Sequence, residues 1–266
     1  MIRIRTNASF LLAILTLNSS NVSAHEFWLE PSPFFAQENT SIDFDIRIGQ
    51  NFGGRLYPFI ERETVQFFVR DADGRRDISA VTGDKPAARI ALTAPAVWVG
   101  YESADFNIRF NDSEKFFSYL NDEGLESVID WYRDNNVDPK GATETYYRHA
   151  KALVWSNPSE PDWLTQPLGM RIELVPQPGF LACSQSPSFQ VLHLNEPLEG
   201  HLVRRFQKDR LDADVALTDA KGMVTFTPKA GQFLLNVVTI DNSTNPRAKG
   251  KDWVSDWGSL TYACTQ

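Results

Sequence analysis

Residues 41–48, Ser41-Ile42-Asp43-Phe44-Asp45-Ile46-Arg47-Ile48, carry the pattern that decides the structural class of this chain. Apolar and polar side chains alternate along the whole stretch. Successive side chains of a β-strand point to opposite faces, so a period of two is typical of a strand that buries only one face. We therefore expect residues 41–48 to form a half-buried β-strand.

Short stretches with similar alternation recur along the chain. Turn sequences such as Asp71-Ala72-Asp73-Gly74 separate them, with glycine where a positive φ is needed. In the first half of the chain the predicted strands cover residues 64–69, 88–92 and 96–101. In the second half they cover residues 170–175, 189–194, 202–206, 215–218, 223–228 and 232–239. Many short strands with turns between them favour β-sandwich architecture.

The period changes between residues 112 and 157. Asn111-Asp112-Ser113 supplies helix-capping side chains, and apolar residues then recur at helical spacing up to Tyr132. After a polar loop a second helical pattern is made by Tyr146, Tyr147, Ala150, Leu153 and Val154. We predict a helical insertion or connector here, whose aromatic stripe packs against the sheets rather than forming a ligand cage.

These patterns predict a mainly β protein of two β-sandwich domains with a helical insertion. The N-terminal domain covers residues 25–111, the insertion or connector residues 112–157, and the C-terminal domain residues 158–266. The strands and glycine turns of the C-terminal domain resemble the small sandwiches of transthyretin-like and carboxypeptidase-regulatory-like modules. Because such modules mostly bind or support other domains, this resemblance argues against an enzyme.

Residues 1–24 have the features of a secretory signal peptide. Arg3 and Arg5 precede the apolar run of residues 9–17, and Val22-Ser23-Ala24 places small residues where signal peptidase cuts. Cleavage after Ala24 would make His25 the first residue of the mature chain. We therefore expect an exported protein that begins at His25.

His25 is the first candidate metal ligand, because a free N-terminal histidine offers an α-amine and an imidazole nitrogen as one chelate. Glu26 could add a carboxylate, although neighbouring side chains of an extended segment point to opposite faces. His149 could reach the same ion, or stack on the aromatic face of the second helical pattern. Nitrogen and oxygen donors of this kind suit Ni²⁺, Co²⁺, Cu²⁺ or Zn²⁺. The alternative interpretation is that His25 is a solvated chain terminus.

The chain has two cysteines, Cys183 and Cys264. An even count in an exported protein favours a disulfide, which here would link the start of the C-terminal domain to the last strand. A pair of thiolate metal ligands is the alternative, but the C-x-x-C spacing of such sites is absent from the sequence. We therefore predict a bond between Cys183 and Cys264.

The net charge and the hydropathy of the chain indicate which kinds of partner it can bind. The chain has 26 Lys and Arg against 34 Asp and Glu, a formal net charge of −8, which argues against binding to nucleic acid and is compatible with attracting cations. Beyond the predicted signal, no apolar run approaches the ~20 residues of a membrane span. We therefore expect no membrane insertion of the mature chain.

Several blocks of the sequence resemble a bacterial periplasmic family of uncharacterised domains, often described as components of nickel or cobalt uptake systems. The first block is His25-Glu26-Phe27-Trp28-Leu29-Glu30-Pro31, directly after the signal. The others are residues 48–54, 71–75, 146–151, 167–169, 172–176, 196–200 and 252–261. The resemblance implies a periplasmic location and a membrane metal-uptake transporter or receptor as the partner. Some members carry a histidine in the loop of residues 49–53, where this chain has Gln50, so the site here would lack one donor if that histidine is a ligand.

Three functions remain open from the sequence. The favoured one is a periplasmic protein that binds nickel, cobalt or copper and serves transition-metal uptake. The first alternative is an accessory or structural module that binds a protein partner. The second is a copper-dependent polysaccharide monooxygenase, which would need a second histidine near His25 and an aromatic surface, for which Trp28, Trp253 and Trp257 are the candidates. We assign no catalytic residue, because the sequence has no G-x-S-x-G or H-E-x-x-H motif.

Overall fold

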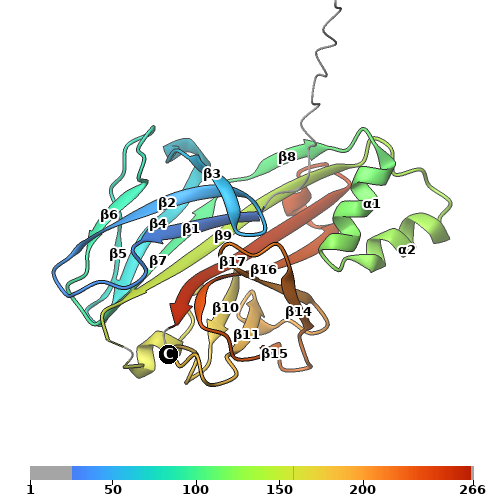
Figure 1. Cartoon of the computed structure of the whole chain (residues 1–266). Helices are drawn as coiled ribbons and strands as arrows, with labels where there is room; N and C mark the ends of the chain where they lie inside the picture. The colour runs from blue at the N-terminus through green and yellow to red at the C-terminus, as the bar shows by residue number, and fades with distance from the viewer. Residues whose placement is uncertain (1–25, 158, 265–266) are drawn as a thin grey trace, which may run out of the picture.

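A computed structural model describes residues 26–157 and 159–264 (Figure 1). The predicted signal peptide and the predicted ligand His25 lie outside the described residues. Within the described ranges the chain is mainly β, with several sheets and two α-helices. Packed sheets with a small helical insertion make it a β-sandwich, which confirms the predicted fold class.

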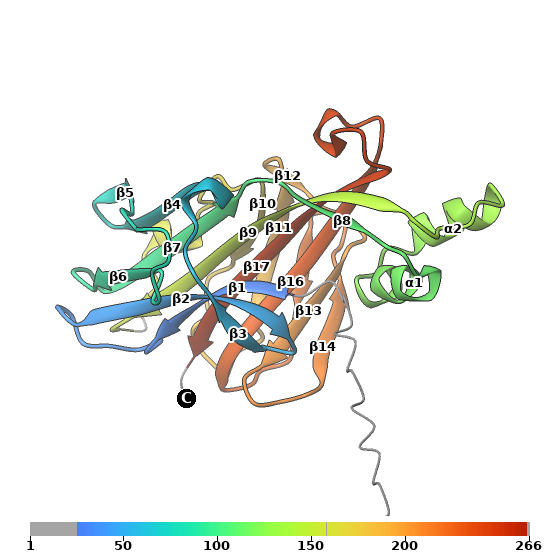
Figure 2. The same cartoon turned by 90° about the horizontal axis from the view of Figure 1, so that it is seen from above.

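A nine-stranded sheet runs through the centre of the molecule. Its strands follow the order β14-β13-β16-β17-β9-β7-β4-β5, and β8 also pairs with β9 (Figure 2). Strands β17 and β9 are parallel, and the other paired neighbours are antiparallel. The strands are β4 (Thr64–Asp71), β5 (Gly74–Asp77), β7 (Ala96–Ser103), β8 (Phe106–Arg109), β9 (Thr143–Trp155), β13 (Leu202–Gln207), β14 (Ala213–Leu217), β16 (Gly231–Asn242) and β17 (Trp253–Cys264).

Two smaller sheets cover the large one. The first has the order β1-β2-β3, with β6 paired to β2, and the second has the order β10-β11-β12, with β15 paired to β11. The strands of the first are β1 (Glu26–Ser32), β2 (Ser41–Gln50), β3 (Gly53–Tyr57) and β6 (Ala88–Ala91). Those of the second are β10 (Ile172–Pro176), β11 (Ser188–His193), β12 (Glu196–Pro197) and β15 (Met223–Thr225).

The two smaller sheets lie on opposite faces of the large one, as strand β9 shows. Ala150 and Ala152 belong to the core that contains Ile46 of β2, whereas Leu153 belongs to the core that contains Leu174 of β10. Alternate residues of a strand point to opposite faces, so each face of β9 packs on a different sheet. In Figure 1, β1–β3 lie above β9, and β10, β11 and β15 lie below it.

Two short helices form the insertion at one end of the large sheet: α1 (Ser113–Asp122) and α2 (Glu126–Asp134) (Figure 2). Asp112 caps α1, because its carboxylate accepts hydrogen bonds from the backbone N–H groups of Glu114 and Lys115 at 2.9 and 3.3 Å. The apolar faces of both helices pack on Trp253 and Trp257 of β17. None of the described helices is long and apolar enough to span a membrane. The described residues also form three 3₁₀ helices: η1 (Glu61–Glu63), η2 (Asp162–Thr165) and η3 (Pro246–Ala248).

The prediction of a second helical pattern over residues 146–154 is wrong, because these residues belong to strand β9. From His149 to Trp155 every side chain of β9 is buried, since the large sheet is covered on both faces. A strand buried on both faces shows no alternation, and its apolar run cannot be told from a buried helix by periodicity. The helical insertion is therefore confined to α1 and α2.

The large sheet takes strands from all three predicted segments. Strands β4, β5, β7 and β8 come from residues 25–111, β9 comes from residues 112–157, and the remaining four come from residues 158–266. Strand β9 joins the two halves, because it pairs with β7 along one edge and with β17 along the other. The division into two domains with a connector stays a prediction.

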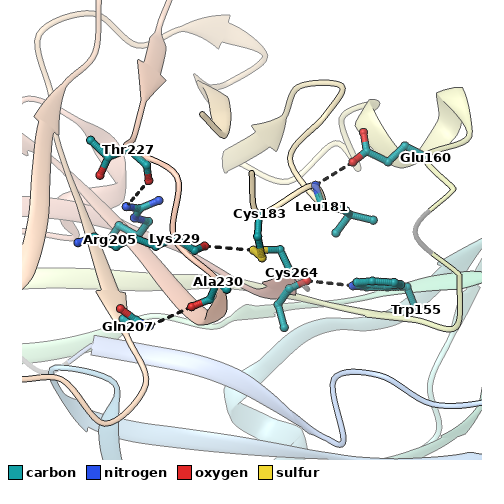
Figure 3. The surroundings of a disulfide bond; sticks show 11 residues. Trp155, Glu160, Leu181, Cys183, Arg205, Gln207, Thr227, Lys229, Ala230 and Cys264 are labelled. Atoms are coloured by element: carbon teal, nitrogen blue, oxygen red, sulfur yellow. Dashed lines mark hydrogen bonds between the residues drawn. A yellow bond between two sulfur atoms is a disulfide. The ribbon is translucent and has the colours of Figure 1, made fainter. Parts of the chain in front are cut away.

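The predicted disulfide is present. Cys183, in the loop before β11, is bonded to Cys264 at the end of β17, with a Cα–Cα distance of 5.4 Å (Figure 3). Beside it, the indole N–H of Trp155 donates to the carbonyl of Ala263 at 3.0 Å. Both cysteines belong to the apolar core between the large sheet and the β10–β11 sheet. The bond therefore fastens one layer of the sandwich to the next.

Candidate functional site

The first strand begins with a buried charged cluster. The side chain of Glu26 is 3% exposed, and its Oε1 lies 3.2 Å from Nη2 of Arg204 on β13. The same nitrogen of Arg204 forms an ion pair with Oε1 of Glu123, which follows α1. Asn236 of β16 donates its amide N–H to the other carboxylate oxygen of Glu123 at 3.1 Å. We call Glu26, Glu123, Arg204 and Asn236 the N-terminal cluster.

Two carboxyl groups share one guanidinium in the N-terminal cluster. Burial raises the pKa of Glu123 to about 8, which the Arg204 charge opposes and the Glu26 charge reinforces. Burial also raises the pKa of Glu26, again opposed by Arg204. Among the described residues the buried Oε2 of Glu26 has no hydrogen-bond partner. The cluster therefore has the capacity to accept one more positive charge or hydrogen-bond donor.

The turn between β2 and β3 lies against the N-terminal cluster. Glu26 is opposite Gly49 in the sheet register, and a backbone hydrogen bond from Asn51 lowers the pKa of the Glu26 carboxyl. Asn51 and Phe52 have φ angles of 53° and 59°, which turn the chain back at this point. The Phe52 ring is buried edge-on against Trp28 at 5.7 Å, which holds the turn in place.

His149 lies in a second, separate buried network. Its ring is 4% exposed, with Nδ1 2.7 Å from Oε1 of Glu102 and Nε2 3.0 Å from Oδ1 of Asp256. Asp256 also pairs with the cationic side chains of Arg171 and Arg247, and with Nε2 of His193 at 3.1 Å. These residues come from the large sheet, the β10–β11 sheet and the η3 region. The network therefore ties three parts of the fold together.

The charges of this network stabilise one another. Burial alone would raise the pKa of Asp256, but hydrogen bonds from His149, His193 and Arg247 outweigh it and hold that pKa far below its usual range. Burial alone would lower the pKa of His149, but Asp256 and Glu102 outweigh it and raise that pKa. His149 is therefore an imidazolium between two carboxylates, with both ring nitrogens occupied. A metal ion could bind it only after one of these ion pairs had been broken.

The structure does not bring His149 and Glu26 together. Across the large sheet His149 is in line with Gly258, Val237 and Val203. Side chains in line across a sheet share a face, so Arg204, the residue after Val203, points to the other face with its partner Glu26. In the described ranges no group of three or more His, Cys, Asp or Glu side chains is arranged to hold a metal ion. Of the three predicted ligands, Glu26 and His149 thus belong to different sites, and His25 stays untested.

Sequence reasoning missed Glu123, Arg204 and Asn236. Glu123 follows a helix among other acidic residues, and 81 positions separate it from Arg204, so no local pattern links them. The predicted strand of residues 202–206 did contain one clue to the cluster. Its two consecutive arginines must point to opposite faces of the sheet, so both faces of an interior strand carry a charge. The three tryptophans considered as an aromatic surface, Trp28, Trp253 and Trp257, are all buried.

Taken together, fold and site define a disulfide-linked β-sandwich protein with a buried carboxylate–arginine cluster at the start of its first strand. A disulfide of this kind is typical of proteins exported to an oxidising compartment. Residues 22–241 match the family described as Domain of unknown function (DUF4198), and the chain belongs to that family. A search of curated proteins found no match.

Proposed function

We propose that the mature protein binds a divalent transition-metal ion, Ni²⁺, Co²⁺ or Cu²⁺, through the α-amine and imidazole of His25, with Glu26 as a neighbouring carboxylate. The observation that carries this proposal is the N-terminal cluster, in which the Glu26 and Glu123 carboxyls share the single guanidinium of Arg204. A cation bound beside the cluster would neutralise the second carboxylate. It would also give a partner to the buried Glu26 oxygen that has none among the described residues.

Covalent geometry supports the location. Residue 25 is joined to Glu26 by a peptide bond, so their Cα atoms are about 3.8 Å apart. Glu26 is held by its ion pair with Arg204 and by its register with Gly49. A chelating residue attached to an anchored strand loses less conformational entropy on binding than one on a free chain end.

Protonation gives the proposed site a defined pH dependence. The α-amine and the imidazole must both be deprotonated to bind a metal, so the affinity falls as the pH drops through their titration range. Glu123, whose pKa burial raises to about 8, would release its proton when the metal charge arrives. The number of protons released on binding at neutral pH should therefore decrease in the Glu123→Gln variant.

The proposed role in the cell is capture of the metal in the periplasm and delivery to a membrane uptake transporter or receptor. The resemblance to nickel and cobalt uptake components supports this role, and the disulfide fits an oxidising compartment. An accessory module that binds a protein partner is the alternative if no metal binds.

Calorimetry on correctly processed protein tests the proposal. We expect Ni²⁺, Co²⁺ or Cu²⁺ to bind one site, and expect both His25→Ala and a one-residue extension before His25 to weaken binding by at least about tenfold. His201→Ala is the matched control, because His201 belongs to neither buried network. Equal binding by the native and extended forms, or no binding of any of the three ions, would show that the proposal is wrong.

A further inference from the structure

A cavity of about 420 Å³ opens between helix α2, the loop after it and the turn that joins β16 to β17. Its walls include Trp131 and Tyr132 of α2, and Trp253 at the start of β17. Lys140 and Asp138 from the loop and Asp252 from the opposite side supply its charged groups. We call this cavity the insertion pocket. Its size is within the range of small-molecule sites, about 300–1,000 Å³.

Trp131 gives the insertion pocket an accessible aromatic wall. Its side chain is 46% exposed, and it is the single aromatic residue among the exposed large apolar side chains in the described part of the chain. The ring packs edge-on against Trp253 at 5.6 Å and against Tyr132 at 5.0 Å. The indole N–H of Trp253 donates to the Tyr132 hydroxyl at 2.9 Å, which fixes the aromatic group behind Trp131. The wall is therefore formed by contacts within the fold itself, without a ligand.

Two carboxylates are held at the pocket by one oxygen each. Oδ2 of Asp252 accepts from the backbone N–H and the hydroxyl of Thr143 at 2.8 and 2.7 Å. Oδ1 of Asp138 accepts from the Ser113 hydroxyl and the Lys140 backbone N–H, both at 2.9 Å. Among the described residues the second oxygen of each carboxylate has no hydrogen-bond partner. Each side chain is thus oriented by the fold while one acceptor stays available.

The aromatic wall and the charged side chains of the insertion pocket favour some classes of ligand over others. A purely apolar ligand would leave the carboxylates and Lys140 unpaired, and an anion would meet two carboxylates against one ammonium. A quaternary ammonium could stack on Trp131, but it could neither donate to the carboxylates nor accept from Lys140. A sugar ring has an apolar C–H face and a rim of hydroxyls that both donate and accept. The aromatic wall and the mixed polar groups complement both parts of such a ring.

We propose that the insertion pocket is a saccharide-binding site, in which one pyranose ring stacks on Trp131 and its hydroxyls bond to Asp138, Asp252 and Lys140. The site is independent of the N-terminal metal proposal, because the two share no residue. It also gives the helical insertion a role beyond covering the end of the sheet.

The test is binding of methyl glycosides and short oligosaccharides of glucose, galactose and N-acetylglucosamine to the full mature chain. Saturation-transfer NMR and tryptophan fluorescence should detect at least one of them binding at millimolar concentration or below. Trp131→Ala should weaken that binding by at least about tenfold, as expected for an aromatic anchor. Leu211→Ala is the matched control, because Leu211 is an equally apolar exposed side chain that does not line the pocket.

The Trp131 ring contacts Tyr132 and Trp253, so the thermal midpoint of Trp131→Ala is recorded and binding is compared at a temperature where both proteins are folded. If no saccharide in the panel binds, or if Trp131→Ala binds as tightly as wild type, the proposal is wrong. Choline and glycine betaine form the second arm of the test. Binding of these cations without any saccharide, weakened by Asp252→Asn, would reassign the pocket to quaternary ammonium compounds and overturn the saccharide assignment.

Discussion

Burial raises the pKa of the Glu123 carboxyl from an ordinary value of 4.5 to about 8, although the charge of Arg204 opposes this shift. The folded protein therefore binds this proton more tightly than the unfolded chain does. The resulting stabilisation is complete below about pH 4.5 and is lost as the pH rises through about 8. Protonation of Glu123 therefore favours the folded protein over the unfolded chain.

We predict that Glu123→Gln reduces the fall in stability between about pH 4.5 and 8, a fall to which Glu144, whose pKa burial raises to about 7, also contributes. Glutamine keeps the shape and a hydrogen-bonding group but cannot ionise. The experiment uses a form extended before His25, so that no free α-amine stands beside the cluster, and records thermal midpoints across this range. Glu126→Gln, at an exposed carboxyl of α2, is the control and should behave as wild type. A wild-type midpoint that does not fall over this range would contradict the prediction.

The His149 network leads to a second prediction at the scale of single residues. His149→Gln and Asp256→Asn each leave buried charges without their partners, which costs about 3–5 kcal/mol of unfolding free energy. Urea denaturation at neutral pH measures this loss. Metal affinity of His149→Gln should equal that of wild type, because the ring lies on the face of the sheet opposite to Glu26. A selective loss of metal binding in a stable His149→Gln protein would show that the two sites are coupled.

Among the structural elements, strands β4 and β7 fit together closely. Gly100 of β7 is opposite Phe68 of β4, and a Cβ added to Gly100 would lie 2.3 Å from the Phe68 ring. The ring is fully buried, and the Arg75 guanidinium covers it at 3.5 Å from its centroid. The absence of a side chain at Gly100 is therefore what allows a large aromatic ring at this place in the sheet.

We predict that Gly100→Ala destabilises the protein by about 1–3 kcal/mol through overpacking. Replacing Phe68 by Leu removes the ring atoms that the new methyl group would meet, so the double variant should lose less than the sum of the two single losses. Denaturant midpoints of the four proteins give the coupling energy. Strictly additive losses would mean that Gly100 is needed for another reason than the Phe68 ring.

Local sequence pattern predicted elements whose buried and exposed side chains recur at a regular spacing. Strand β2 was predicted from the alternation of residues 41–48, and the cap at Asp112 marked the start of α1. Strand β9 was taken for a helix, and β17 was given no bounds, because both are buried on both faces and show no alternation. Short apolar runs still predicted the buried strands β7 and β16, so what the pattern missed in the large sheet is the parallel pair β9 and β17 at its centre.

The candidate site shows the same division between local and long-range information. The disulfide was predictable because the chain has only two cysteines. Glu26 was predicted because it follows the expected cleavage point directly. Its partner Arg204 and the second carboxyl on that guanidinium, Glu123, come from distant segments, and only the tertiary fold brings them together. The separation of His149 from Glu26 also depends on sheet register, which a single sequence does not reveal.

At the scale of the whole molecule, the disulfide closes a ring across 81 positions of sequence separation and links two layers. We predict that replacing both Cys183 and Cys264 by serine lowers the free energy of unfolding by about 2–5 kcal/mol, mainly because the unfolded chain gains freedom. Urea denaturation of this variant measures the loss, and wild type in a strong reductant should match it. Equal stability of the variant and oxidised wild type would mean that the bond contributes nothing beyond the packing around it.

Strand β17 lies between β16 and β9, well inside the nine-stranded sheet, although it comprises residues 253–264. Without it the sheet separates into β14-β13-β16 on one side and β9-β7-β4-β5 on the other. A chain that emerges from a ribosome or a translocation channel in order of sequence cannot join these halves until its last strand has appeared. Closure of the large sheet is thus a late step in the folding of a chain that emerges in this order, because it depends on residues 253–264.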